Sequence, residues 1–383
     1  MTKKIWFVST LLILAITLAG CTSSAITTST SPTSNIPAIT DTNSSSASVN
    51  GIDATLESIY NRVNPSVVNI QVVLPESINN PGGGALASGF VWDTQGDIVT
   101  NNHVINGATR ITVTFYDGTT IDAKLVGADA DSDLAVIKVD PNGLQLQPVS
   151  MADSTKVQVG QLAIAIGNPF GLQGTMTAGI VSGLGRLVPT DENAVGPTYS
   201  IPDVIQTDAA VNPGNSGGVL LDDTGAVIGV TQSIDTTSGS SSGVGFAIPA
   251  AIVEQVVPEL ISNGHYDHPY LGISVISLDP DLSTNMNLPA NQRGALVETV
   301  TAAGPADKAG IKGSATVVTI NGQQTDVGGD VITAYNGQTV KSSDDLITFM
   351  ARSGSVGQKV TLTILRDGKT IQVQATLGLR PSS

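Results

Sequence analysis

The chain has 383 residues, of which 40% are hydrophobic and 4% aromatic, and its formal net charge is −15. This length allows two or three domains with hydrophobic cores of their own. Contacts to nucleic acid phosphates need clustered Lys and Arg, so an acidic chain without a basic stripe is not expected to bind nucleic acid. The single cysteine, Cys21, excludes an intrachain disulfide and a multi-cysteine metal site.

Residues 1–20 have the features of a signal peptide, because Lys3 and Lys4 precede the apolar run "IWFVSTLLILAITLA". The run is shorter than the roughly 20 residues that a membrane-spanning helix needs. It leads into "LAGC", which resembles the lipobox of bacterial lipoproteins, where cleavage precedes the cysteine and the thiol is acylated. We therefore expect a lipid anchor on Cys21. An ordinary signal peptide with an incidental cysteine and an uncleaved signal anchor are the alternatives, and each places the domains outside the cytoplasm.

Residues 21–51 are rich in Ser and Thr and have no periodic apolar face, so they are expected to form a flexible tether. Directly afterwards, Leu56, Ile59 and Val63 recur at spacings of three and four, with polar residues between them. This pattern predicts a short amphipathic helix, which Pro65 ends.

Short runs rich in β-branched residues follow, separated by turn signals such as "YDGT", and they predict strands and hairpins. One set contains "VVNIQVVL", "ASGFVWD", "DIVTNN", "RITVTFYDGTTIDAKLVGAD" and "LAVIKVD". A second set contains "QLAIAIGNP", "TMTAGIVSGLG", "VIQTDAA", "GVLLDDTGAVIGVTQSI" and "GVGFAIP". The chain is therefore mainly β, and two packed antiparallel β-barrels fit better than a βαβ sheet. The segment "AAIVEQVVPELISNG" predicts a helix that closes this unit and ends at Gly264.

A smaller unit is expected over residues 268–380. Its strand-like runs are interrupted by "SSDDLITFMARSG", which predicts a helix capped by Ser342 and ended by Gly354. Between "AGIKG" and "GGDVITAYNGQ", residues 314–327 predict an additional pair of strands around "NGQQ".

The bend "NPGNSGG" places Ser216 in a glycine-rich segment that, taken alone, is an ordinary turn. A serine hydroxyl becomes a nucleophile when a base takes its proton, and His is the usual base near neutral pH. His103, in "VTNNHVI", is the only histidine before residue 263. A buried carboxylate would fix its tautomer and stabilise its cation. Asp133, just before an apolar strand, fits that role, and Asp129 and Asp131 are alternatives.

The motifs "TNNHVI", "DSDLAVIKV" and "NPGNSGGVLL" occur in the order His, Asp, Ser, and on them residues 52–380 resemble the chymotrypsin-like HtrA (Deg) family of serine proteases. The resemblance implies a trypsin-like protease domain of two six-stranded antiparallel β-barrels over residues 52–264, followed by one PDZ domain over residues 268–380. It implies His103 as the general base, Asp133 as its orienting carboxylate and Ser216 as the nucleophile. The backbone N–H groups of Gly214 and Ser216 would form the oxyanion hole.

The same resemblance puts the floor of the S1 pocket six residues before the nucleophile, at Ala210. No acidic side chain stands there, so cleavage after Lys or Arg is not expected. Apolar walls are expected from Ile228, Val230, Phe246 and Ile248. Small or medium aliphatic side chains would fit this pocket. Because such side chains are mostly buried in folded proteins, unfolded chains are the expected substrates.

The segment "YLGI" resembles the PDZ loop that binds a peptide carboxylate, and it comprises Tyr270, Leu271, Gly272 and Ile273. Its backbone N–H groups would bind a C-terminal peptide, which would add a strand to the domain. The family also implies a homotrimer, and "RLVPTDENAVGPTYSIPD" and "DTTSGSSSG" resemble its sensor and pocket loops.

We therefore expect a serine endopeptidase, tethered to the outer face of the bacterial cytoplasmic membrane, that degrades unfolded or damaged proteins without a cofactor. A dedicated regulatory protease for one membrane substrate is an alternative. A lipoprotein that holds peptides through its PDZ domain without cutting them is another. His265 and His268 have no evident third ligand group, so they are expected to be solvated and not to bind a metal.

Overall fold

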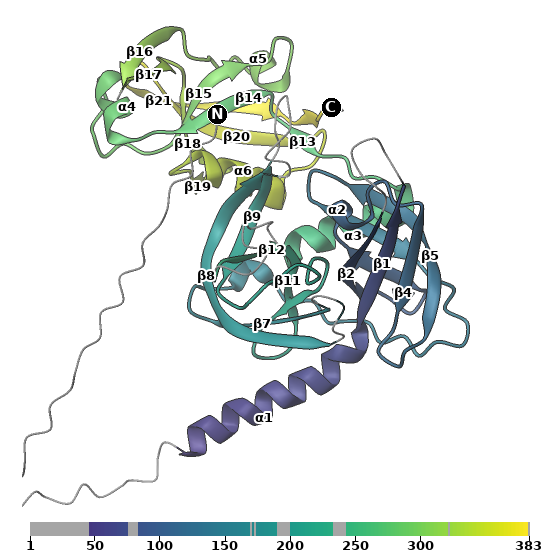
Figure 1. The fold of residues 1–383 in the computed structure, drawn as a ribbon. Helices are drawn as coiled ribbons and strands as arrows, with labels where there is room; N and C mark the ends of the chain where they lie inside the picture. The colour runs from purple at the N-terminus through teal and green to yellow at the C-terminus, as the bar shows by residue number, and fades with distance from the viewer. Residues whose placement is uncertain are drawn as a thin grey trace, which may run out of the picture. The chain divides into compact units, whose positions relative to one another are not determined.

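The structure of the chain is a computed structural model, shown in Figure 1, that describes residues 46–75, 83–168, 171, 174–189, 200–232, 243–320 and 322–381. Residues 49–383 form one compact unit. The predicted signal peptide, Cys21 and most of the tether lie outside the described residues, as do residues 190–199 and 235–242 of the two predicted loops. In the part of the chain that is described, no helix combines the length and apolar character needed to cross a bilayer.

Helix α1 (Ser46–Val63) is followed by the short helix η1 (Asn64–Ser66), so the helix ends before Pro65 as predicted. Ile59 and Val63 are buried in the largest core cluster. The tether was expected to reach residue 51, but the helix already begins at Ser46. Once a helix exists, each residue added to it forms one further hydrogen bond and avoids the cost of nucleation. A polar segment without an apolar face can therefore extend the helix.

The first β-barrel is closed, with strand order β1-β2-β3-β6-β5-β4. Its strands are β1 (Val67–Leu74), β2 (Gly83–Val91), β3 (Asp97–Thr100), β4 (Arg110–Thr114), β5 (Thr120–Asp129) and β6 (Leu134–Lys138). The short helix α2 (Asn102–Ile105) follows β3 directly. The interior is mainly aliphatic, and Ile70, Ile98 and Ile137 are fully buried in it.

The second barrel is also closed, with strand order β10-β11-β12-β9-β8-β7. Its strands are β7 (Leu162–Gly167), β8 (Thr175–Pro189), β9 (Ser200–Thr207), β10 (Val219–Leu221), β11 (Val227–Gln232) and β12 (Gly245–Pro249). The short helix η2 (Ser154–Lys156) precedes them. Helix α3 (Ala250–Asn263) follows and ends at Gly264, whose φ of +78° suits a left-handed C-cap. The prediction of two six-stranded antiparallel barrels is confirmed.

The two barrels share one hydrophobic cluster. It includes Phe90 and Leu134 from the first barrel and Ile164, Val219 and Val230 from the second, and each of these side chains is at most 1% exposed. Burying apolar area between the barrels therefore fixes the ends of their strands against each other. Polar residues next to those strands meet at this junction, since Asp133 just before β6 accepts a hydrogen bond from Gln232 at the end of β11.

The C-terminal domain contains a sheet in which β14, β15, β18, β20 and β21 are neighbours in that order and β19 pairs with β18. Its strands are β14 (Ile273–Ser277), β15 (Ala295–Val300), β18 (Val331–Tyr335), β19 (Gln338–Thr339), β20 (Lys359–Arg366) and β21 (Lys369–Thr376), while β13 (Pro269–Tyr270) pairs with β22 (Gly378–Leu379). The short helix α5 (Pro305–Lys308) follows β15. Helix α6 (Ser343–Ser353) begins where predicted, with the Ser342 hydroxyl accepting from Asp345 N–H at 3.1 Å.

The predicted additional strand pair is present, with β16 (Thr316–Ile320) antiparallel to β17 (Gln323–Val327). The helix α4 (Pro280–Asn285) was not predicted. Its signals are present, because the Asp279 carboxylate caps Leu282 N–H at 2.7 Å and Pro280 occupies the first turn. At six residues it is too short to show a hydrophobic period.

Candidate active site

His103 and Asp133 come from the two segments that connect to β3 and β6, which are paired strands of the first barrel. His103 lies on α2, and the Nδ1 atom of its ring is 2.7 Å from Oδ2 of Asp133. The backbone N–H of His103 donates to Oδ1 of the same carboxylate at 2.8 Å. Both carboxylate oxygens therefore face His103, which fixes the orientation of the imidazole.

The backbone of Asp133 is held in an uncommon conformation. Its φ is +52°, in the left-handed region that Asp adopts more readily than most non-glycine residues. Its carbonyl oxygen accepts from Asn102 N–H at 3.1 Å and from the Asn101 side-chain amide at 2.9 Å. Asp133 is only 4% exposed. The carboxylate thus lies at low dielectric, where its interaction with an imidazolium is strong.

Ser216 follows a tight turn at the start of the strand pair β10–β11. The Asn215 N–H donates to Asn212 O at 2.9 Å, and Gly214, with φ of +98°, occupies the position of a type II turn that favours glycine. Thr231 on β11 holds the segment after the turn, because its hydroxyl donates to Asn215 O at 2.6 Å. The backbone conformation around Ser216 is therefore determined on both sides.

The same loop is in contact with the first barrel. The Ser88 hydroxyl donates to Gly214 O at 2.7 Å, and Ser88 N–H donates to Ser216 O at 2.8 Å. A β-carbon on Gly217 would lie 2.1 Å from Ser88 O and 2.4 Å from the Thr100 hydroxyl. Since Thr100 is three residues before His103, the segments that carry Ser216, His103 and Asp133 meet at one place between the barrels.

The residues predicted for the S1 pocket differ in exposure. Ala210 is partly exposed, and its carbonyl accepts from the Thr177 hydroxyl at 2.9 Å. Phe246 is also partly exposed. The other three, Ile228, Val230 and Ile248, are at most 1% exposed and are packed in the barrel cores. Of these five residues, only Ala210 and Phe246 are therefore accessible to a peptide.

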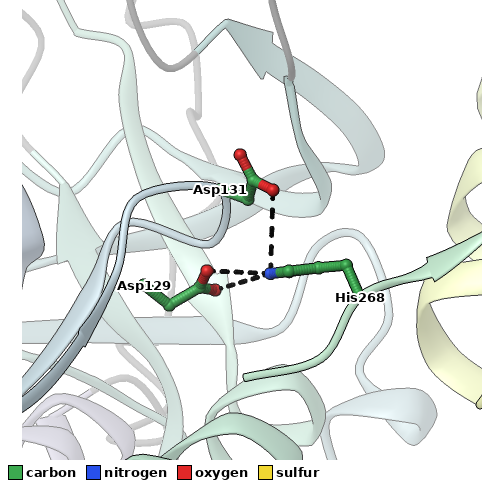
Figure 2. A group of neighbouring side chains, drawn as sticks. All are labelled: Asp129, Asp131 and His268. Carbon is green, nitrogen blue, oxygen red and sulfur yellow. Dashed lines mark hydrogen bonds and ion pairs between the residues drawn. The ribbon is translucent and has the colours of Figure 1, made fainter. Parts of the chain in front are cut away.

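Asp129 and Asp131, the alternatives to Asp133, lie against a different histidine. Nε2 of His268 is 2.8 and 2.9 Å from the two carboxylate oxygens of Asp129 and 3.9 Å from Oδ2 of Asp131. Figure 2 shows both carboxylates directed at this nitrogen. The five-residue segment "DADSD" thus supplies carboxylates to two histidines, and only Asp133 faces His103.

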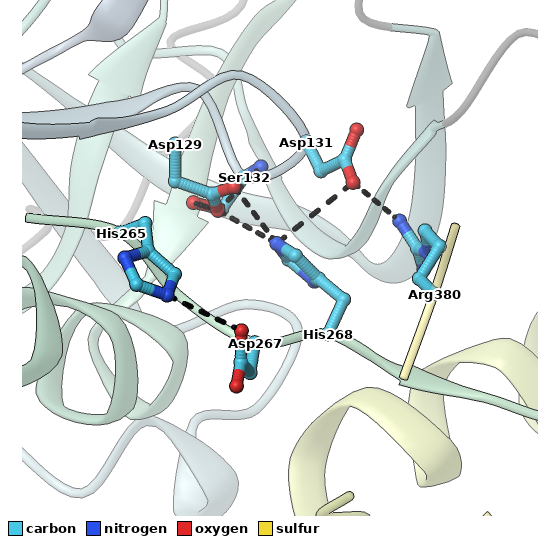
Figure 3. Close-up of polar contacts among 7 residues, drawn as sticks. All are labelled: Asp129, Asp131, Ser132, His265, Asp267, His268 and Arg380. Carbon is cyan, nitrogen blue, oxygen red and sulfur yellow. Dashed lines mark hydrogen bonds and ion pairs between the residues drawn. The ribbon is translucent and has the colours of Figure 1, made fainter. Parts of the chain in front are cut away.

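The prediction that His268 is solvated is wrong, because its side chain is 17% exposed and paired with Asp129. The linker lies against the end of β5 before the chain enters the second domain. The His268 imidazole makes this contact, because it lies beside the carboxylates of Asp129 and Asp131. His265 is exposed as predicted, at 67%, and lies 3.5 Å from Asp267 (Figure 3).

The surroundings of Asp129 determine its charge. Burial alone raises the pKa of this carboxyl group, but hydrogen bonds from His268 and Ser132 and the charge of His268 outweigh burial and lower the pKa below 3.8. Nη1 of Arg380 lies 2.8 Å from Asp131 Oδ2 (Figure 3). The ligand atoms of Asp129, Asp131 and His268 lie within 4.8 Å of one another. The Arg380 cation already neutralises part of their charge, so the cluster is satisfied as an ion-pair network.

In the second domain, β14 is the edge strand of its sheet. Helix α6 begins beside it, where Ser343 N–H donates to the Ser277 hydroxyl at 3.0 Å. In the preceding loop, the carbonyls of Leu271 and Gly272 accept from Ala306 and Thr301 N–H, each at 2.9 Å. The N–H groups of Leu271 and Gly272 donate to no other described residue. The edge of β14 is thus available for pairing with a further strand, while Leu271 and Gly272 of the loop are buried.

Comparisons with known proteins agree with this architecture. Residues 87–230 match the trypsin-like peptidase domain and residues 269–377 match the PDZ domain. The protein named Serine protease Do-like HtrB from Bacillus subtilis is 38% identical over 333 residues, which are 82% of this chain and 68% of that protein. The chain belongs to the HtrA family of serine proteases. The solved structure described as the HtrA-type protease AlgW with tripeptide has a TM-score of 0.67 at 34% identity, and the match covers 85% of this chain and 98% of that chain.

Two other HtrA relatives extend well beyond the region that they share with this chain. Protease Do-like 1, chloroplastic, of Arabidopsis thaliana is 43% identical over 294 residues, which are 77% of this chain and 64% of that protein. A probable periplasmic serine endoprotease DegP-like of Brucella suis is 41% identical over 298 residues, 78% of this chain and 53% of that protein. The chain therefore matches about half to two thirds of the length of these HtrA proteins.

Sequence reasoning missed the residues that hold the loop of Ser216 in this HtrA chain. Ser88 lies 126 residues from Gly214 in the sequence, although the two form a hydrogen bond. Thr231 lies at the end of a strand whose pattern gives no sign of a polar role. Their contacts depend on how the barrels close, and no local motif reports that.

Proposed function

We propose that the chain is an extracytoplasmic serine endopeptidase that cleaves unfolded or damaged polypeptides with a triad of Ser216, His103 and Asp133. The observation that carries this proposal is the bond of 2.7 Å between His103 Nδ1 and Asp133 Oδ2 beside the loop of Ser216. An ionised carboxylate only accepts, so Nδ1 carries the hydrogen and Nε2 keeps its lone pair. Nε2 can then take the Ser216 proton during attack on the scissile carbonyl and later give it to the leaving amine.

The oxyanion hole is proposed to consist of the N–H groups of Gly214 and Ser216. Support comes from the turn, in which Gly214 has φ of +98° and the preceding Pro213 restricts the backbone. Fixed donors stabilise the negative charge that develops on the carbonyl oxygen without reorganising. Losing one such donor typically costs about 2.7–4 kcal/mol of transition-state stabilisation.

The preferred residue before the cleaved bond is proposed to be small or medium and aliphatic. Ala210 contributes no charge to the expected pocket floor, and the exposed wall contains Phe246. Val230 and Ile248 belong to the core cluster against which Phe246 packs, whereas Ile228 is buried in another cluster. Because aliphatic side chains are mostly buried in folded proteins, this preference directs the enzyme to unfolded chains.

C-terminal peptides are proposed to bind the PDZ domain by adding a strand to β14, with the carboxylate at the loop from Tyr270 to Ile273. The open edge of β14 and the N–H groups of Leu271 and Gly272 support this mode of binding. We also propose that the chain acts as a homotrimer held to the outer face of the membrane through its N-terminal segment, by acylation of Cys21. Relatives named as periplasmic endoproteases support the extracytoplasmic location.

The test is degradation of a permanently unfolded protein, such as carboxymethylated casein, by the full chain purified in detergent. Ser216→Ala is the decisive variant, and Ser262→Ala, at an exposed position, is the control. Cleavage by the wild type and the control but not by Ser216→Ala is expected, with fragments ending in Val, Ala or Ile. Equal cleavage by Ser216→Ala would overturn the assignment of Ser216 as the nucleophile. No cleavage by the wild type, with C-terminal peptides bound, would favour a non-cutting peptide-binding lipoprotein.

A further inference from the structure

Gln232 is the last residue of β11, a strand of the second barrel, and it is 9% exposed. Its amide Nε2 donates to Oδ2 of Asp133 at 3.2 Å. This is the carboxylate oxygen that also contacts Nδ1 of His103 at 2.7 Å. Gln232 and Asp133 are 99 residues apart and belong to different barrels. The contact therefore connects the second barrel directly to the carboxylate of the first.

The orientation of the Gln232 amide is determined by Asp133. If the amide were flipped, Oε1 would face the carboxylate, and two acceptors would repel each other. With Nε2 on Asp133, Oε1 is buried and has no hydrogen-bond partner among the described residues. Leaving a buried acceptor unpaired is unfavourable, so a glutamine whose role was only to stabilise the fold would be expected to have both ends satisfied.

Gln232 also follows Thr231, which holds the loop of Ser216. The Thr231 hydroxyl donates to Asn215 O at 2.6 Å, and its carbonyl accepts from Gly217 N–H at 2.9 Å. Two consecutive residues thus hold two parts of the site that lie on different barrels. A small shift of the end of β11 would move the nucleophile loop and the carboxylate together.

We propose that Gln232 is a positioning residue, which fixes the carboxylate of Asp133 so that Oδ2 stays directed at Nδ1 of His103. This inference rests on the proposed function. Asp133 is the only titratable side chain that hydrogen-bonds the Gln232 amide in the described part of the chain, and Asp133 in turn bonds His103. Gln232 therefore acts on His103 through Asp133. Replacing the Gln232 Nε2 donor by another group should change the basicity of the His103 imidazole.

Two substitutions of similar size separate this role from a structural one. Gln232→Met keeps the length of the side chain and removes both polar ends, including the unpaired acceptor. We expect kcat to fall about tenfold to 100-fold with KM nearly unchanged, as for the loss of a hydrogen bond to a charged group. The midpoint of unfolding in urea is expected not to decrease. Gln158→Met, at an exposed position before β7, is the control.

Gln232→Glu places a second carboxylate beside Asp133. The additional negative charge favours the imidazolium form of His103, so the acidic limb of kcat/KM is expected to move up by about one pH unit. Because the introduced carboxylate and that of Asp133 repel each other, a proton shared between them would restore the hydrogen bond at low pH. Kinetics would use the full chain and a fluorogenic peptide with Val before the cleaved bond, over a range of pH.

A readout without turnover keeps this inference separate from the proposed function. In Ser216→Ala protein, the titration of His103 is followed by NMR, and His265→Gln and His268→Gln variants assign the three histidine signals. A higher pKa of His103 in Gln232→Glu than in the parent is expected even if the wild type cleaves nothing. Unchanged titration together with unchanged kcat in Gln232→Met would overturn the proposal. Loss of activity that only parallels loss of stability in Gln232→Met would overturn it too.

Discussion

The Nε2 atom of His268 lies 2.8 Å from Oδ1 of Asp129, although 139 residues separate the two in the chain. Asp129 ends β5, four residues before Asp133, and His268 is in the linker that enters β13. The linker to the PDZ domain is therefore bonded to the segment that presents the carboxylate proposed for the triad. Only four positions in the chain separate Asp129, which holds this linker contact, from Asp133.

Removing His268 is expected to destabilise the protein. In His268→Ala, Asp129 keeps its burial but loses the partner that hydrogen-bonds both of its oxygens. Losing a hydrogen bond to a charged group typically costs about 1.5–3 kcal/mol. Urea unfolding at neutral pH measures the change. His265→Ala, at a side chain that is 67% exposed, is the control and should change the free energy of unfolding by less than about 0.5 kcal/mol.

Asp129 also makes stability depend on pH. Its pKa in the folded chain is below 3.8, so the unfolded chain binds the proton more tightly. The contribution of Asp129 to stability is therefore present above about pH 4 and is lost as the pH falls through the folded pKa. The difference in free energy of unfolding between the wild type and Asp129→Asn should be larger at about pH 5 than at about pH 3. A difference that does not change over this interval would contradict the prediction.

Parts of the fold and site follow from local sequence and parts do not. Residues around His103, Asp133 and Ser216 form short motifs, and the helix ends at Gly264 and Ser342 have standard capping residues. The pairing of Asp129 with His268 was not predicted, because three carboxylates within "DADSD" are equivalent until the backbone directs each one. Asp133 was already favoured by its motif and its place before an apolar strand, but the φ of +52° with which it faces His103 is reported by neither composition nor spacing.

A contact between β9 and α6 gives another pH-dependent prediction. The guanidinium of Arg352 bonds the carboxylate of Asp203, which is 2% exposed. Burial raises the pKa of Asp203 above 3.8, and the hydrogen bond and charge of Arg352 offset part of this effect. Since the folded pKa is raised, stability due to this group is lost as the pH rises through that pKa. Arg352→Met should make this loss larger.

We expect Arg352→Met to lower the free energy of unfolding by about 3 kcal/mol near pH 8, because it leaves a buried charge without its partner. The decrease should be smaller near pH 4, where Asp203 binds a proton. The double variant Asp203→Asn with Arg352→Met should recover much of the stability at pH 8, because Asn tolerates the φ of +63° at this position. Arg293→Met, at an exposed position, is the control. Equal losses at both pH values would show that packing of the Arg352 stem, and not its charge, stabilises the contact.

The assignment of Asp133 rather than Asp129 or Asp131 to His103 is tested by three amide substitutions. In Asp133→Asn, a side-chain amide that donates to Nδ1 would force the hydrogen of His103 onto Nε2, the atom proposed to accept the Ser216 proton. Such a change lowers kcat about 10⁴-fold in proteases of this chemistry. Asp129→Asn and Asp131→Asn keep the bond of 2.7 Å between His103 and Asp133, so kcat should stay within a few-fold of the wild type. Steady-state hydrolysis of one peptide by the wild type and the three variants tests which carboxylate acts on His103. An Asp129→Asn enzyme as inactive as Asp133→Asn, at unchanged stability, would mean that the wrong carboxylate has been assigned.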